Sequence, residues 1–204
     1  MNTPSHVVKS MKRAPAARQA GSFLLEFALL AMFFFVLVFT ILEVARGLYM
    51  WNTLQEVTRR AARSASVTDF NDAAAMNALR QAAVFRDGPG ELALGKPITD
   101  KHIRIDYMSM QHDSNSSSSM VSMPAAAMPS CPARNRVNCA KDNGDASCIR
   151  LIRVRICQPG GSECTPVPYE PLFPLVKLPM NYPVATTIVR AESLGYVPGS
   201  ALCN

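Results

Sequence analysis

Hydrophobic residues are concentrated in one long run close to the N-terminus. Residues 23–42 read FLLEFALLAMFFFVLVFTIL, and only Glu26 and Thr40 are polar in this stretch. A helix of about 20 residues rises about 30 Å, which is the thickness of the hydrocarbon core of a bilayer. A buried helix of a small soluble domain would carry a polar stripe, and this run has none. The pattern therefore predicts a helix that spans a membrane once.

Helix-forming residues continue beyond the run, without a proline, from Glu43 to about Ser66. Apolar positions in this second stretch recur at steps of three and four: Val44, Leu48, Trp51, Leu54, Val57, Ala61 and Ala65. This spacing is typical of an amphipathic helix. We therefore expect residues 22–66 to form one helix, whose second half packs its apolar stripe against a partner surface.

Residues 67–204 are predicted to form a small head that contains both helix and strand. Asp72 is a suitable N-cap for a short alanine-rich helix over residues 73–85. Alternating or β-branched residues predict three strands, at residues 103–107, 152–156 and 184–190. Residues 111–130 are rich in serine, proline and methionine and are expected to form a long mobile loop. The predicted fold class is α+β, with a long N-terminal helix packed on a small antiparallel sheet and loops stapled by disulfides.

The six cysteines all follow the hydrophobic run: Cys131, Cys139, Cys148, Cys157, Cys164 and Cys203. An even number of cysteines on one side of a membrane segment favours disulfides in an oxidising compartment, although six cysteines allow fifteen pairings. A metal site is the alternative, but the sequence has no C-x-x-C or H-x-x-x-H motif, and only His102 and His112 follow the run. We therefore expect disulfides, no metal and no cofactor. The first three cysteines are expected to tether irregular backbone.

The charge distribution predicts how the chain is oriented. The net charge is +6. Four basic side chains, with no acidic residue among them, precede the run: Lys9, Lys12, Arg13 and Arg18. The first stretch after the run is slightly negative, and the positive-inside rule then places residues 1–21 in the cytoplasm and residues 67–204 on the other side. No basic patch is interleaved with aromatic residues, so we expect no nucleic-acid partner.

Glu26 interrupts the hydrophobic run, although a charge near the centre of a bilayer costs about 3 kcal/mol. One explanation is that Glu26 lies only a turn inside the run, where it reaches the membrane surface or stays protonated. A second explanation uses Gly21 and Ser22, which separate the basic tail from the run. Cleavage between them would create an amino group, and an ammonium group stabilises a carboxylate in a low-dielectric setting. An amine from a neighbouring chain would reach Glu26 at only one axial stagger of the two helices.

The residues around this site resemble a known family. Residues 21–27 (GSFLLEF) resemble the processing site of type IV prepilins, with a basic leader, a glycine and a glutamate at the fifth mature position. Four segments are similar to the TadE-like pseudopilins of tight-adherence (Flp) pilus systems: 42–49 (LEVARGLY), 52–55 (NTLQ), 60–63 (RAAR) and 187–192 (TIVRAE). The similarity is strongest over residues 18–66. Phe27 stands where the major Flp pilins usually carry tyrosine, which favours the minor TadE/TadF-like group.

The resemblance implies a role in pilus biogenesis rather than catalysis. A membrane prepilin peptidase would cut after Gly21, leaving Ser22 as the mature N-terminus and Glu26 as the assembly carboxylate. The partners would be other pilins or pseudopilins and the assembly platform of the bacterial inner membrane. The C-terminal domain would lie in the periplasm or in an extracellular, adhesive pilus. The sequence carries no nucleophile-elbow, phosphate-loop or zinc-protease motif, so we expect no catalytic residues.

Other interpretations of these features stay open. An uncleaved signal-anchored protein whose periplasmic head binds a ligand would have the same topology. A conventional secretory signal is disfavoured, because its apolar core is usually about 7–15 residues long and no A-x-A site follows the run closely. The alternating Met108, Met110 and His112 could bind copper, but in a serine-rich stretch they are better explained as ordinary loop residues. Tyr49 and Trp51 are expected to anchor the helix at the membrane–water interface.

Overall fold

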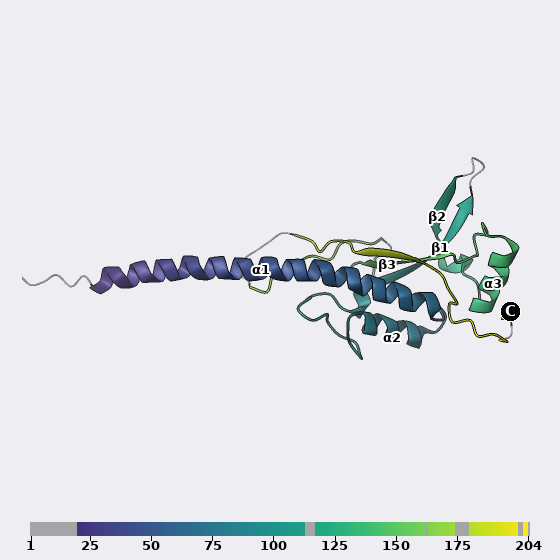
Figure 1. Ribbon diagram of the computed structural model, residues 1–204, viewed down its shortest axis with the longest axis horizontal. Helices are drawn as coiled ribbons and strands as arrows, with labels where there is room; N and C mark the ends of the chain where they lie inside the picture. The colour runs from purple at the N-terminus through teal and green to yellow at the C-terminus, as the bar shows by residue number, and fades with distance from the viewer. Residues whose placement is uncertain (1–19, 113–116, 162, 174–179, 200–201, 204) are drawn as a thin grey trace, which may run out of the picture. The chain divides into compact units, whose positions relative to one another are not determined.

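The structure is a computed structural model, and it describes residues 20–112, 117–161, 163–173, 180–199 and 202–203. Its elements are α1 (Ala20–Val67), α2 (Ala73–Ala83), η1 (Asp100–His102), β1 (Ile103–His112), β2 (Ser118–Ser122), η2 (Ala125–Ala127), α3 (Pro132–Lys141), β3 (Leu151–Ile156) and β4 (Thr186–Arg190), where η marks a 3-10 turn (Figure 1). The long apolar helix, the small antiparallel sheet and the paired cysteines confirm the predicted α+β fold. The chain divides into two compact units, Met1–Ile41 and Leu42–Asn204, and we call the second unit the head.

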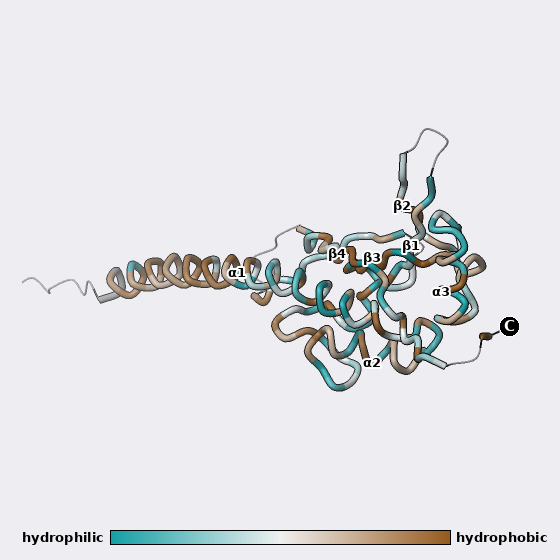
Figure 2. The backbone as a smooth tube through the Cα atoms, turned by 45° about the vertical axis from the view of Figure 1, so that its right-hand side comes forward, coloured by the Kyte–Doolittle hydropathy of each residue, from teal (hydrophilic) through white to brown (hydrophobic). Residues whose placement is uncertain are grey.

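The part of α1 within the first unit exposes nearly all of its apolar side chains. Phe23, Leu30 and Phe33 are 70%, 69% and 70% exposed. The start of α1 is accordingly the longest hydrophobic stretch of the tube in Figure 2. Among the residues that the structure describes, α1 is the one helix long and apolar enough to cross a membrane. So much exposed apolar surface is stable only in lipid or against other apolar surfaces, as expected for a membrane-anchored protein.

Within the head, α1 buries one face in the hydrophobic core. The buried apolar residues of this face are Met50, Leu54, Val57, Ala61, Ala62 and Ala65. The predicted stripe is thus correct from Leu54 onward but wrong before it, because Val44, Leu48 and Trp51 are 57%, 65% and 55% exposed. At about 100° per residue, Leu48 lies about 120° around the helix from Leu54. The predicted positions therefore combine two different sides of the helix, and only the side that includes Leu54 faces the core.

The four strands form one antiparallel sheet in the order β2-β1-β3-β4. Strand β3 is central, and its alternation divides the two faces of the sheet. Ile152, Val154 and Ile156 are buried in the core that the sheet shares with α1. Arg153 and Arg155 point to the opposite face and are partly exposed. All three predicted strands are present, and β1 runs five residues further than predicted because it continues into a hairpin with β2.

Helix α2 begins where the sequence predicts. The Asp72 carboxylate accepts a hydrogen bond from the backbone N–H of Ala75 at 2.9 Å, which satisfies one of the free donors of the first turn. The helix ends at Ala83, two residues before the predicted end. Phe85 has a φ of 60°, and this left-handed conformation cannot continue a right-handed helix.

The prediction of a loop over residues 111–130 is wrong for part of that stretch. Strand β2 lies within it and pairs with the end of β1, with Met120 opposite Met110. All five residues of β2 are exposed. Because β2 is held by backbone pairing rather than by burial, its sequence lacks the alternation that marks a half-buried strand. Residues 113–116 lie outside the described part of the chain.

The prediction of irregular backbone between the first three cysteines is also wrong, since α3 fills much of this segment. Pro132 occupies the start of α3, where its fixed φ suits a helix and its missing N–H costs nothing. The side chain of Asn135 then accepts a hydrogen bond from the N–H of Ile149 at 2.7 Å. This bond holds α3 beside the start of β3, and its partner lies 14 residues away in the sequence.

The cysteines form three disulfides, which confirms that they pair with one another. The pairs are Cys131–Cys203, Cys139–Cys148 and Cys157–Cys164. The first joins residues 72 positions apart, whereas the other two close loops of 9 and 7 positions. In the chain-entropy description a loop of that greater length stabilises the folded state by about 4 kcal/mol. The Cys131–Cys203 disulfide, which closes the longest loop, therefore ties the C-terminal segment to the start of α3.

Candidate functional site

The predicted processing site lies at the beginning of α1. The helix starts at Ala20, so Gly21 and Ser22 belong to its first turn. Glu26 follows one turn after Ser22, and its side chain is exposed on the helix. The rest of the predicted basic leader, residues 1–19, lies outside the described residues. The cleavage itself stays a prediction.

Three exposed apolar residues form a separate surface on α1 within the head. Val44, Leu48 and Trp51 are spaced by four and three residues, so they lie on one side of the helix, and we call them the outer face of α1. Tyr49 is 45% exposed but follows Leu48 directly, about 100° around the helix. Aromatic side chains exposed so soon after the apolar run are suited to a membrane interface. The anchoring role of Tyr49 and Trp51 stays a prediction.

A buried ion pair lies on the face of α1 that packs into the head. Glu43 and Arg46 are 3% and 8% exposed, and Arg46 Nη1 lies 3.0 Å from Glu43 Oε1. Two further groups donate hydrogen bonds to this carboxylate: the Tyr169 hydroxyl and, at 3.2 Å, the backbone N–H of Leu172. Burial and the bond to Glu43 raise the pKa of Tyr169 to about 12, which keeps its hydroxyl a donor. We call these four residues the Glu43–Arg46 cluster.

Arg46 also connects α1 to two separate loops of the head. Its Nε donates to the carbonyl oxygen of Leu94 at 2.8 Å, and its Nη2 donates to that of Lys96 at 3.4 Å. Its Nη1 donates to the carbonyl oxygen of Glu170 at 2.8 Å. The Tyr182 hydroxyl accepts from Nη2 at 3.3 Å. One guanidinium group therefore bonds three backbone carbonyls, and that of Lys96 also accepts from the Tyr182 hydroxyl at 2.9 Å.

The sequence analysis missed this cluster, because it treated Glu43 and Arg46 only as charges beside the membrane. A signal was present in the helical spacing. Glu43 precedes the buried Met50 by seven residues, and Arg46 precedes the buried Leu54 by eight, so all four lie on one face. The partners of the pair come from residues more than 40 positions away, and no local pattern identifies them.

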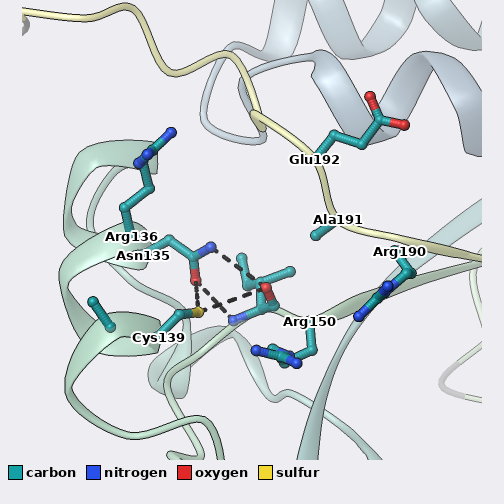
Figure 3. A pocket seen from close by; sticks show the side chains of 9 residues that line it. Asn135, Arg136, Cys139, Arg150, Arg190, Ala191 and Glu192 are labelled. Carbon is teal, nitrogen blue, oxygen red and sulfur yellow. Dashed lines mark hydrogen bonds between the residues drawn. The ribbon is translucent and has the colours of Figure 1, made fainter.

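A positively lined hollow of about 550 Å³ lies between α3 and the ends of β3 and β4 (Figure 3). Its charged lining residues are Arg136, Arg150, Arg190 and Glu192. Asn135 points toward the same hollow, but its amide bonds the backbone of Ile149 at both N–H and carbonyl, at 2.7 and 3.4 Å. Cys139 is held in a disulfide. The lining suits an anionic ligand better than nucleophilic chemistry.

A family model described as TadE-like protein matches residues 21–63. This part of the chain is similar to TadE-like proteins. The matched segment begins at Gly21 and includes Glu26, the outer face of α1 and the ion pair, but it covers only about a fifth of the chain. No curated protein and no solved structure matches the chain. The apolar helix to which this segment belongs is that expected of a membrane-anchored protein.

Proposed function

We propose that this protein is a minor, TadE-like pseudopilin that acts in the assembly of a type IVb (Flp/Tad) pilus and packs against other pilins through α1. The observation that carries the proposal is the exposure of apolar side chains from Phe23 to Ile41, within the segment that matches the family. Lipid chains and other apolar helices can both cover such a surface. The same helix can therefore leave the bilayer and enter a helical bundle without refolding.

The proposal includes cleavage after Gly21 by a prepilin peptidase. The new ammonium group would stand on Ser22, and Glu26 lies about 6 Å further along the helix axis. An amine and a carboxylate compensate each other in apolar surroundings, where either charge alone is costly. Contact between the Ser22 amine of one subunit and the Glu26 of the next would set the axial stagger of packed helices.

The Glu43–Arg46 cluster has a supporting role in this mechanism. It joins the part of α1 that enters the head to loops that are distant in the sequence. A buried, multiply bonded arginine cannot reorient freely, because each of its bonds would have to be replaced. The cluster thereby fixes the position of those loops against the part of α1 that lies within the head.

The remaining parts of the proposal concern location and partners. The basic tail would stay in the cytoplasm and the head would lie in the periplasm, where disulfides form. The partners would be the prepilin peptidase, other pilins or pseudopilins and the inner-membrane assembly platform. We propose a structural role without catalysis, at the inner membrane or within an extracellular, adhesive fibre.

The first test is the N-terminus of the protein purified from membranes of its native host. Mass spectrometry is expected to find a chain that begins at Ser22. A Gly21→Leu variant is the matched control, since it removes the residue that the peptidase would recognise and should begin at Met1. Wild-type protein that begins at Met1 in a host with functional pili would contradict the proposed processing.

The second test replaces Glu26 by glutamine, which removes the charge but keeps the size. We expect E26Q to be processed, exported and disulfide-bonded, yet to lower the number of pili per cell by at least about tenfold, because an amine without its carboxylate is costly in apolar surroundings. The matched control is E56Q, which removes an exposed acid of the same helix. Normal piliation with E26Q would defeat the assembly role of this carboxylate.

An uncleaved signal-anchored module that binds a ligand is the second candidate. The arginine-lined hollow in Figure 3 favours it, because Arg150 and Arg190 lie beside space open to an anion. In that case R150Q/R190Q would abolish function while E26Q would leave it intact. The proposed assembly role expects the reverse result from these two variants.

A further inference from the structure

Strand β4 ends the sheet, and among the described strands it pairs only with β3. The hydrogen bond from Ala191 N to Arg150 O, at 2.9 Å, shows that the odd-numbered residues beside this strand bond toward β3. Because bonding directions alternate along a strand, Thr186, Ile188 and Arg190 turn their N–H and C=O groups to the other edge. These three residues form what we call the open edge of β4 (β4 is labelled in Figure 2).

A groove of about 340 Å³ lies between β4 and α1. Its lining residues are Glu56, Arg59, Arg60, Arg63, Thr187 and Val189. Arg60 pairs with Glu56 at 3.1 Å, whereas neither Arg59 nor Arg63 forms an ion pair with any carboxylate in the described part of the chain. Two positive charges four residues apart on a helix repel each other. Negative charge entering the groove would relieve that repulsion.

The opposite face of the sheet is also positive beside β4. Arg153 lies directly across from Ile188 in the ladder. Asp106 takes part in ion pairs with Arg104, Arg153 and Arg155, at 3.0, 3.2 and 2.6 Å. Three guanidinium groups around one carboxylate leave a net positive patch. The open edge of β4 is therefore flanked by arginines on both sides of the sheet.

We infer that the open edge of β4 is a docking site for an extended, acidic segment of another protein, which adds to the sheet as a further strand. Main-chain hydrogen bonds to an exposed sheet edge supply affinity in this mode of recognition, and alternate side chains supply specificity. The side chains of an added strand would point alternately toward the groove and toward the opposite face. Acidic residues at those positions would meet Arg59 and Arg63 on one side and Arg153 and Arg155 on the other. This inference does not depend on cleavage after Gly21.

The apolar side chain of Ile188 strengthens the choice of a peptide as the occupant. It is 43% exposed in the middle of the open edge, which leaves apolar area that a docked side chain can cover. A lipid headgroup would use the arginines but would leave both this apolar area and the backbone groups of the edge uncovered. The two kinds of occupant can therefore be separated experimentally.

The experiment uses the full chain in nanodiscs of phosphatidylcholine, a neutral lipid, and a labelled short peptide of glutamates around one central valine, which carries acids on both faces of the added strand. Fluorescence anisotropy is expected to show binding of this peptide but not of the same peptide with lysine in place of glutamate. Removing both helix charges with R59Q/R63Q should weaken binding by at least about tenfold. R86Q/K101Q removes two exposed charges elsewhere on the head and should bind like the wild type.

A second pair of variants tests the backbone pairing. Ile188→Pro removes an N–H that points away from β3, a position at which an edge strand tolerates proline. We expect I188P to lose peptide binding and I188V to keep it, with wild-type near-ultraviolet circular dichroism and intact disulfides in both. Unchanged binding by I188P, or equal binding of the lysine peptide, would overturn strand addition. Protein that binds phosphatidylglycerol vesicles but does not bind the peptide would also overturn strand addition.

Discussion

Replacing Arg46 by methionine removes the six hydrogen bonds that its guanidinium group donates. Methionine retains much of the apolar stem, so the change is mainly a loss of charge and donors rather than of volume. The Glu43 carboxylate is left buried, although the Tyr169 hydroxyl and the N–H of Leu172 still bond to it.

The expected cost can be worked from these contacts. Breaking a buried ion pair by removing one partner typically costs about 3–5 kcal/mol, because the other charge stays buried. The two remaining donors to Glu43 place the expected loss in the free energy of unfolding near the lower end, at about 3 kcal/mol. In E43Q/R46M the buried unpaired charge is gone, so the loss should fall to about 1–2 kcal/mol, for the carbonyls of Leu94 and Glu170 that lose their bonds to Arg46.

The assay is urea unfolding of the head in the full chain, reconstituted in nanodiscs with its disulfides intact. Near-ultraviolet circular dichroism of the tyrosines reports on the site, because the rings of Tyr169 and Tyr182 pack 5.0 Å apart beside Arg46. The slope of the transition should be unchanged while its midpoint falls.

Arg60→Met is the matched control, since it makes the same change in a pair whose members are 51% and 49% exposed. An exposed helix pair contributes about 0.3–0.5 kcal/mol, and the stacking of Arg60 over the Phe85 ring, 4.5 Å from its centroid, contributes about 0.5–1 kcal/mol. R60M should therefore cost about 1 kcal/mol. If R46M were no more destabilising than R60M, or no more destabilising than E43Q/R46M, the buried pair would not hold the loops of the head on α1.

Three further predictions use the same unfolding assay. Burial alone would raise the pKa of Asp106, but hydrogen bonds from Arg155 and Arg104 outweigh this effect and hold the pKa below its usual value. Asp106 therefore stabilises the folded protein fully above about pH 3.9, and this stabilisation is lost as pH falls through the lower pKa of the folded state. D106N should flatten that acid limb, and an equally steep limb would contradict the assignment. Gly195→Ala should cost about 1–3 kcal/mol more than Gly199→Ala, because both have positive φ but only at 195 would the new Cβ meet backbone, at 2.6 Å. Asp72→Ala should cost about 1 kcal/mol by leaving the Ala75 N–H without its cap, and no loss would show that the cap is dispensable.

Much of the fold follows from local pattern, and α1 shows why. The apolar run and the proline-free stretch after it predict one helix over residues 22–66, and the helix extends over Ala20–Val67. Backbone hydrogen bonds in a helix join residues four apart, so a local sequence contains most of the information needed to place it. The same holds for the capped start of α2 and for β3, whose alternation between apolar residues and arginine separates the two faces of the sheet.

The strand β2 and the inward-facing part of α1 show where local pattern fails. β2 is exposed along its whole length, so hydrophobicity does not mark it, and its pairing with β1 is a non-local event. The stripe that begins with Val44 fails because apolar residues occupy two sides of this part of α1, and their spacing does not say which side faces the sheet. In both cases the deciding contact comes from a segment that the local sequence does not contain.

By itself, the sequence determined that this protein has a long apolar helix, a glycine and a glutamate at prepilin-like spacing, and six cysteines after the helix. Only the tertiary structure decided which cysteines pair, which side of α1 faces the head, and that Glu43 and Arg46 are buried together. The reason is physical. Periodicity records which face of an element avoids water, whereas a buried charge or an open strand edge is defined by the distant groups that do or do not reach it.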